Sequence, residues 1–175
     1  MINTTVNDGQ GQAPVAIIGF GCAGLNAAIA LRRAGYTGTV QVFSDTDTLP
    51  YSPILTSYFA GGEKTREECF PWSASEIEAL ELDLVASSPV EHIDIEAHEI
   101  RTAHGSYPYA KCIIASGSRP MAYGFPPADG YVPLMLRTMA DADRLKSTLE
   151  DPACKRLLVS GASMVALKTL EAALN

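Results

Sequence analysis

Residues 15–35 constrain the fold of this 175-residue chain more than any other stretch. Residues 15–18 are apolar and suit a buried parallel strand, and glycines at positions 19, 21 and 24 follow in G-x-G-x-x-G spacing. Gly19 permits a tight turn, Gly21 lets a pyrophosphate approach the backbone, and Gly24 lets a helix pack on the strand. The stretch therefore predicts a strand, a glycine turn and a helix whose first amides attract phosphate, which is a mononucleotide-binding unit.

Two other interpretations of this stretch are a membrane span and a signal peptide. Residues 13–31 contain no charged side chain, and this uncharged run is long enough to suggest either a membrane span or a signal peptide. However, Asp8 precedes the run and no Lys or Arg does, and three glycines with Asn26 would make a poor spanning helix. We therefore favour the nucleotide-binding interpretation.

A carboxylate follows at the spacing expected for a dinucleotide site. Residues 39–43 read as a second strand, and this strand ends at Ser44-Asp45. An acidic residue at this distance from the first glycine typically holds a ribose hydroxyl. The sequence therefore predicts that Asp45 contacts a ribose, with Asp47 as the alternative.

The composition indicates a mildly acidic globular chain, with a formal net charge of −7 and 47% hydrophobic residues. Nucleic acid is not expected as a partner, because the largest basic cluster is Arg32-Arg33. The four cysteines form no C-x-x-C and no metal-ligand spacing with the three histidines. We therefore expect a reduced cytoplasmic protein with no metal site and no membrane partner.

Helices and short strands are expected in the middle of the chain. Residues 54–59 suggest a short helix that packs on either a ligand or plain core, and residues 73–81 suggest a helix with a Ser73/Glu76 capping box. Period-two segments then predict an antiparallel meander of four strands: residues 83–86, 90–95, 99–104 and 106–109. Residues 111–117 read as a further apolar strand that ends in a small-residue turn.

The last third of the chain repeats the opening theme. A helix is expected from Thr138 to Leu149, and residues 156–160 read as a strand before Gly161 and a final helix. This second fingerprint keeps only its first glycine and has Ser163 at the second position. It predicts a second, weaker nucleotide-binding start. Val165 excludes a serine nucleophile elbow, which needs glycine at that position.

With these motifs the sequence resembles the N-terminal portion of the FAD-dependent pyridine nucleotide-disulfide oxidoreductase superfamily. The most similar branch includes rubredoxin and ferredoxin reductases, NADH oxidases and the nitrite reductase large subunit. The resemblance implies an α/β fold: a Rossmann-like FAD-binding domain with a parallel sheet and an antiparallel β-meander, then the opening βα unit of a second, NAD(P)-binding Rossmann-like domain. We expect a leader at residues 1–13, the first FAD-domain segment at 14–120, and a connection with the start of the NAD(P) domain at 121–175.

The resemblance also implies the cofactor contacts and the reaction. FAD would contact the first fingerprint, the backbone of Val90 and the small-residue strand end, and NAD(P)H would contact the second fingerprint. The candidate cofactor-binding residues are Gly19, Gly21, Cys22, Ala23, Gly24, Asp45, Val90, Ala115, Ser116, Gly117, Arg119, Gly161 and Ser163. No catalytic side chain is expected, because hydride passes from NAD(P)H to FAD and the flavin carries the chemistry to an unidentified electron acceptor.

Departures from the family pattern narrow this expectation. Ile54 stands near the position of the family's redox cysteine, and the first helix lacks paired cysteines, so thiol-disulfide chemistry is not expected. The family's cationic residues are missing from residues 50–58. Ser163 and Lys168 replace a glycine and a glutamate of the nicotinamide motif, which leaves NADH versus NADPH open. Cys22 either fills a small-residue position or is a reactive thiol at a helix N-terminus.

Family chains also continue beyond the second fingerprint. This chain is therefore expected to be a truncated product, one subunit of a split protein, or a reduced complete domain. The alternative function is a non-catalytic nucleotide-binding or assembly module. Apolar residues around Leu157, Leu158, Met164, Leu167 and Leu170 should leave a surface that a second copy or a complementary subunit covers, unless the chain is mobile from about residue 151.

Overall fold

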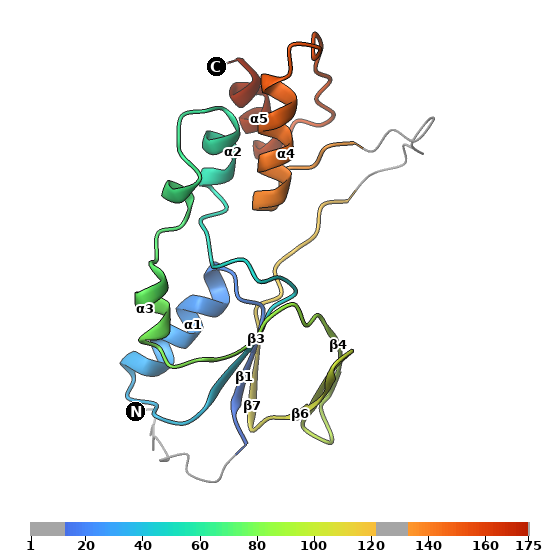
Figure 1. Cartoon of the computed structure of the whole chain (residues 1–175). Helices are drawn as coiled ribbons and strands as arrows, with labels where there is room; N and C mark the ends of the chain where they lie inside the picture. The colour runs from blue at the N-terminus through green and yellow to red at the C-terminus, as the bar shows by residue number, and fades with distance from the viewer. Residues whose placement is uncertain (1–12, 122–132, 175) are drawn as a thin grey trace. The chain divides into compact units, whose positions relative to one another are not determined.

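The computed structural model describes residues 13–121 and 133–174, which form two compact units. The first unit contains the chain up to Pro50 and residues Trp72–Gly117. The second contains Tyr51–Pro71 and the chain from Ser118 onward (Figure 1). The chain therefore passes between the units three times, and residues 51–71 belong with the C-terminal part.

A four-stranded parallel sheet is the centre of the first unit. Its strands are β1 (Val15–Ile18), β2 (Val40–Phe43), β3 (Asp83–Val85) and β7 (Lys111–Ile114), in the order β3-β2-β1-β7. Ile18 of β1 is paired with Phe43 on one side and Ile114 on the other. Because the strands are parallel, their carboxyl ends meet at one edge, which we call the carboxyl edge.

Two helices, α1 (Cys22–Arg33) and α3 (Ala74–Glu78), cover one face of this sheet (Figure 1). The core between them and the sheet is built from apolar side chains of β1, β2, α1 and the glycine turn: Ile17, Phe20, Leu25, Ala28, Val40 and Val42. All six are buried. This packing places the start of α1 at the carboxyl edge.

An antiparallel meander of β4 (Val90–Asp94), β5 (Glu99–Thr102) and β6 (Gly105–Pro108) packs on the other face. Successive strand residues point to opposite faces, so Ala16 and Ile18 face the meander whereas Ile17 faces the helices. The near-continuous apolar character of β1 is thus explained by burial on both faces.

One strand expectation was wrong. Residues 83–86 were placed in the meander, but β3 pairs in parallel with β2 at the edge of the main sheet. The segment between β2 and β3 includes α3 and is long enough for a crossover connection, so β3 runs parallel to β2. A side-chain hydrogen bond of 2.7 Å from Gln41 Nε2 to Asp83 Oδ2 adds to this pairing.

Arg32 ties the end of α1 to the chain that follows α3. Its Nε donates to the Leu80 carbonyl at 2.7 Å, and its Nη2 donates to the Glu81 carbonyl at 2.9 Å. Its Nη1 donates to the carbonyls of Tyr36 and Gly38 at 2.9 and 2.8 Å. One guanidinium thus binds four carbonyls and fixes the C-terminal end of the helix.

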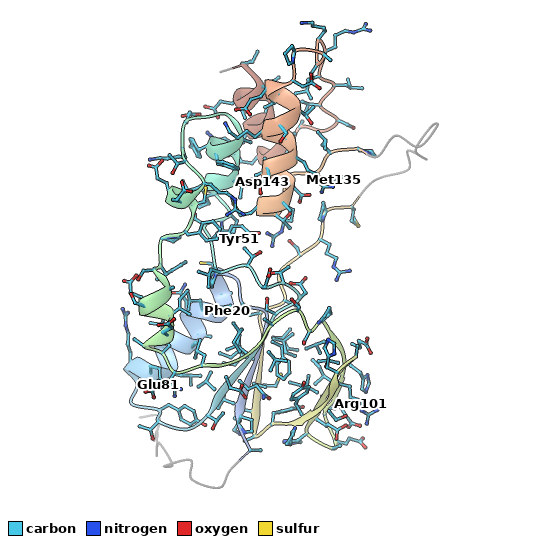
Figure 2. All side chains as sticks on the ribbon, viewed as in Figure 1. Phe20, Tyr51, Glu81, Arg101, Met135 and Asp143 are labelled. Atoms are coloured by element: carbon cyan, nitrogen blue, oxygen red, sulfur yellow. The ribbon has the colours of Figure 1, made fainter. Side chains whose placement is uncertain are left out.

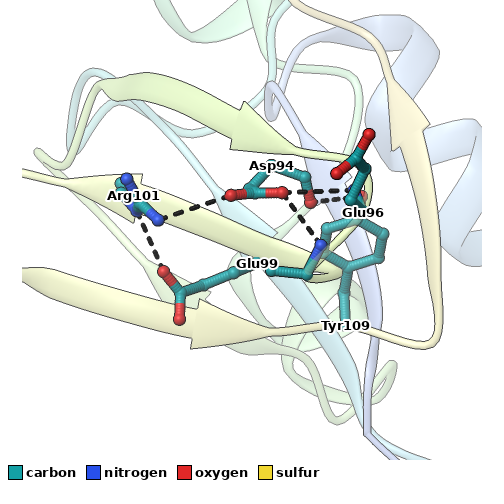
Figure 3. A network of polar contacts seen from close by, with 6 residues as sticks. Asp94, Glu96, Glu99, Arg101 and Tyr109 are labelled. Atoms are coloured by element: carbon teal, nitrogen blue, oxygen red, sulfur yellow. Dashed lines mark hydrogen bonds and ion pairs between the residues drawn. The ribbon is translucent and has the colours of Figure 1, made fainter.

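A polar network holds the turn between β4 and β5 (Figure 3). Asp94 Oδ1 accepts from the Ala97 amide at 2.9 Å, and this hydrogen bond is the main reason that the pKa of Asp94 is lowered. Arg101 lies between Asp94 and Glu99, with N–O distances of 3.5 and 2.9 Å. The Tyr109 hydroxyl donates to the Asp94 carbonyl at 3.3 Å, so the network includes the buried residue that follows β6.

The described part of the second unit is helical. It contains α2 (Leu55–Ala60), the 3₁₀ helix η1 (Glu67–Cys69), α4 (Met139–Glu150) and α5 (Met164–Leu174). The buried centre of its core consists of Phe59, Cys69, Met139 and Ala142. A Cβ on Gly61 would lie 2.9 Å from Ala172 Cα, so the end of α2 approaches α5 too closely for a side chain.

The predicted helix starts are confirmed. Ser73 and Glu76 form the capping box of α3, and Thr138 and Asp141 form that of α4. The helix predicted at residues 54–59 is α2, which packs in the helical core.

The predicted strand at residues 156–160 was wrong. These residues have no regular secondary structure, and Leu158 is 92% exposed. A parallel strand needs a neighbouring strand for its hydrogen bonds, and the described part of this unit contains no strand. The apolar surface predicted here is confirmed, with Met164 72% and Leu167 54% exposed.

The apolar stretch at residues 13–31 is divided between β1 and α1. Gly19 and Gly21 separate the two elements, and α1 has 12 residues. Over residues 13–121 and 133–174, no helix is both long and apolar enough to cross a membrane.

We predict that Asp141→Asn destabilises the second unit by about 1 kcal/mol at neutral pH, as expected for a helix cap. Burial raises the pKa of Asp141, but hydrogen bonds from Thr138, Arg144 and the Arg137 amide outweigh burial, and the net pKa is lowered. The stabilisation by the charged carboxylate is therefore complete above the unfolded-state pKa of about 3.9 and is lost as the pH falls through the lower, folded-state pKa.

Urea unfolding followed by circular dichroism between neutral and strongly acidic pH measures this effect. Asp143→Asn on the same helix is the matched control, because its exposed ion pair with Arg66 should contribute little. If the free energies of unfolding of wild type and Asp141→Asn still differed at strongly acidic pH, the prediction would be contradicted.

Candidate nucleotide-binding site

The glycine turn after β1 is locked by close backbone contacts. Gly19 has a φ of +103°, and a Cβ there would lie 2.3 Å from the Ala115 carbonyl oxygen. A Cβ on Gly24 would lie 1.9 Å from the Gly19 carbonyl oxygen. Ala115 also donates its amide to Ile18 at 2.8 Å. The turn, the start of α1 and the chain after β7 therefore meet backbone against backbone.

Gly21 differs from the other two glycines because its Cβ position is open. Apart from the glycine and its two chain neighbours, no atom lies within 4 Å of that position, and its φ of −84° is available to any residue. Gly21 is the N-cap of α1, yet no side chain caps the helix and no acidic residue lies in its first turn. The first amides of a helix have no intrahelical partner, so those of Cys22 and Ala23 face open space with the positive end of the helix dipole.

The neighbouring strands bring further candidates to the carboxyl edge. Asp45 follows β2 and is exposed, as is the alternative residue Asp47. Ser116 and Gly117 follow β7 and are also exposed. Because β2 and β7 flank β1, these residues lie on either side of the glycine turn. This edge is where open α/β sheets bind ligands.

A cavity of about 330 Å³ opens beside this edge, between the meander and the ends of β1 and β7. It brings together two predicted residues, Val90 and Ser116. It is also lined by Glu91, His92 and Ile114, which the sequence analysis did not select. In the sequence these three residues are notable only as neighbours of Val90 and Ala115. They meet in the cavity because strands that are distant in the chain pack together, which the sequence does not show.

The remaining candidates, Arg119, Gly161 and Ser163, lie in the second unit and are exposed. Gly161 has a φ of +118°, which favours glycine. The Ser163 hydroxyl accepts from the Ala166 amide at 3.3 Å and so caps α5. One amide at the N-terminus of α5 is thus bound by a side chain of the protein, whereas α1 has no side-chain cap.

Lys168 of α5 is held within the second unit. Its Nζ lies 2.5 Å from Glu171 Oε2 and 3.0 Å from the Tyr58 hydroxyl. The hydrogen bond with Glu171 is the main reason that the pKa of Lys168 is raised. Lys168 therefore keeps its charge and links α5 to α2.

The four cysteines are free thiols at separate places. Cys69 is fully buried, and its Sγ contacts the Thr65 carbonyl at 3.6 Å. Burial raises the pKa of both Cys69 and Cys112, which makes these thiols less reactive. Cys22 is exposed, with the Asn26 amide nitrogen 3.6 Å from its Sγ. Among the described residues, no His, Cys, Asp and Glu side chains gather in a group that could hold a metal ion.

Comparison with known proteins identifies the family. The sequence pattern of the pyridine nucleotide-disulphide oxidoreductases matches residues 13–175. The chain belongs to this family. Members of the family use FAD and NAD(P)H, and the predicted membership and α/β fold class are confirmed.

Individual members of the family are similar over most of this chain. A rhodocoxin reductase from Rhodococcus erythropolis is 30% identical over 161 residues, which cover 91% of this chain and 37% of that protein. The ferredoxin–NAD(+) reductase component of an anthranilate 1,2-dioxygenase system from Burkholderia cepacia is 30% identical and is covered over 39% of its length.

A solved ferredoxin reductase from Rhodopseudomonas palustris superposes with a TM-score of 0.82 at 25% identity, over 95% of this chain and 40% of that one. This member of the oxidoreductase family therefore spans about two fifths of the length of the relatives that it matches.

We predict that Gly21→Val abolishes binding of FAD and of ADP while the chain remains folded. The valine side chain would enter the open space at the start of α1, where a pyrophosphate must approach, and its Cβ meets no other part of the protein there. Isothermal titration with both nucleotides, together with a thermal melt, measures the two effects.

Gly24→Ala is the informative control, because its Cβ collides with the Gly19 carbonyl and should lower the melting temperature. Unchanged nucleotide affinity in Gly21→Val would mean that the pyrophosphate does not bind at this turn.

Proposed function

We propose that the chain is the FAD-binding part of an NAD(P)H-dependent flavoprotein oxidoreductase without a redox-active cysteine. The observation that carries the proposal is the uncapped N-terminus of α1, which opens at Gly21 on the carboxyl edge of the parallel sheet. An exposed helix end with free amides and no neighbouring carboxylate in its first turn suits a pyrophosphate.

The residues at the carboxyl edge would bind and orient the cofactor. The amides of Cys22 and Ala23 would donate to the pyrophosphate, and the Asp45 carboxylate would accept from the ribose hydroxyls. The cavity beside Val90 and Ser116 would receive a further part of the dinucleotide. When bound, FAD supplies the hydride-accepting ring, and the protein supplies position and electrostatics.

The second unit would lead into the nicotinamide-binding region. Gly161 allows the tight turn before α5. Arg119 follows the small-residue strand end of the FAD-domain segment and is an exposed cation that could contact the cofactor. The Ser163 hydroxyl accepts from the Ala166 amide but keeps its own proton, which it could donate to a phosphate. In this proposal residues 14–120 are the first FAD-domain segment and residues 121–175 connect to the NAD(P) domain.

Electrons would leave to a small carrier protein of the ferredoxin type, since one of the relatives is named as a ferredoxin reductase. Thiol chemistry is not part of the proposal, because exposed Ile54 stands near the redox-cysteine position and Cys69 is buried. Free cysteines suit a reducing cytoplasm, and a second copy or a complementary subunit would cover the exposed side chains of α5.

The alternative is a non-catalytic module that binds only the ADP half of FAD. Two features of α5 favour it: Ser163 already caps this helix, and Lys168 is engaged by Glu171. Flavin absorbance of the purified chain, followed by addition of NADH or NADPH, separates the two functions. Bleaching of bound flavin supports the oxidoreductase, whereas ADP binding without flavin retention supports the module, and absence of both refutes the nucleotide site.

We predict that Asp45→Ala weakens FAD binding by about 1.5–3 kcal/mol, the range for a hydrogen bond to a charged group. Asp45 is exposed, so its removal should leave the fold intact. Asp47→Ala is the matched control, because it removes the same charge from the same loop. Titration of both variants with FAD decides the assignment. If only Asp47→Ala loses FAD affinity, Asp47 and not Asp45 contacts the ribose.

A further inference from the structure

A second cavity, of about 420 Å³, lies on the helical face of the first unit, between α1 and α3. Its α1 wall consists of Leu25, Ile29, Arg32 and Arg33, which share one face of the helix. The volume is within the range of small-molecule sites in proteins. We call this cavity the α1/α3 pocket.

The α1/α3 pocket is apolar on its α3 side as well. Trp72 and Ile77 occupy the positions just before the N-cap and at the fourth residue of α3, where side chains pack as a hydrophobic staple. Leu80 lines the pocket after the helix ends, and Arg32 holds its carbonyl. These contacts fix the walls, so the pocket is formed before any ligand arrives.

The charge of the pocket is positive. Arg32 and Arg33 face a single carboxylate, that of Glu76. Glu76 Oε2 is already bound by the Ser73 amide and hydroxyl, each at 2.8 Å, in the capping box. Arg32 directs most of its donors at carbonyls, whereas the exposed Arg33 has no ion pair or side-chain hydrogen bond among the described residues. Arg33 is thus a cation free to bind an anion at the rim of an apolar pocket.

This pocket is separate from the nucleotide site. Phe20, in the glycine turn, and Glu81, beside the end of α3, lie at opposite ends of α1 (Figure 2). The pocket is on the helical face of the sheet, whereas the uncapped helix end opens at the carboxyl edge. A ligand in the pocket would therefore leave the nucleotide residues free.

We infer that the α1/α3 pocket binds a small organic carboxylate with an apolar body, such as an arylalkanoate. The apolar part packs against Ile29, Trp72 and Ile77, and the carboxylate pairs with the Arg33 guanidinium. The positive charge of Arg33 selects this class over a neutral ligand of the same shape.

Trp72 is the single tryptophan of the chain, so its fluorescence reports on the pocket directly. Titration of the full 175-residue chain with 4-phenylbutyrate should give saturable quenching with a Kd of about 1 mM or tighter, matched by saturation-transfer NMR on the ligand. The neutral analogue 4-phenylbutanol should bind about tenfold more weakly.

Arg33→Gln should weaken 4-phenylbutyrate about tenfold or more and leave 4-phenylbutanol and FAD affinity unchanged. Arg156→Gln is the matched control, because it removes the same charge from an exposed site in the second unit and should leave all three affinities unchanged. Selective loss in Arg33→Gln supports the site.

Three outcomes would overturn this inference: no saturable binding by either method, equal binding of acid and alcohol, or equal loss in both arginine variants. Sedimentation of the free chain adds a fourth. A dimer that Arg33→Gln dissociates would mean that a second copy, and not a small carboxylate, occupies the pocket.

Discussion

The first unit depends on one constraint, the backbone-to-backbone approach of three segments at Gly19. The Gly19 turn lies against Ala115 after β7, and Gly24 brings the first turn of α1 onto the same glycine. No side chain can be accommodated at either glycine without a shift of the backbone. The direction of α1, and hence the point at which its free amides emerge, follows from this packing and from Arg32, which holds the far end of the helix.

The two fingerprint helices differ in how their first amides are satisfied. α1 starts at a glycine that offers no side chain, so an incoming anion has no competitor. α5 starts at Ser163, whose hydroxyl already accepts from Ala166. At α5 one of the first amides, that of Ala166, is already bound by a side chain, whereas α1 has no side-chain cap and its first amides remain available to a phosphate.

Local signals in the sequence predicted local structure well. The limits of β1, the Ser73/Glu76 capping box, the helix start at Thr138 and the glycine turn depend on residues within a few positions of one another. The errors concern partners that are distant in the chain: β3 joined the parallel sheet, and residues 156–160 have no strand to pair with. The cavity residues Glu91 and His92 were missed for the same reason, since a period-two pattern does not show what a strand faces.

The chain passes between the two units at residues 50–51, 71–72 and 117–118, so neither unit is a continuous piece of polypeptide. α2 is synthesised early, but the helices that bury Phe59 and approach Gly61 are α4 and α5, which follow the whole sheet in the sequence. Phe59 and Cys69 therefore remain exposed to solvent until the strands of the first unit and then α4 and α5 have been synthesised. Such contacts between remote segments slow folding, and apolar groups exposed in the meantime are what chaperones bind.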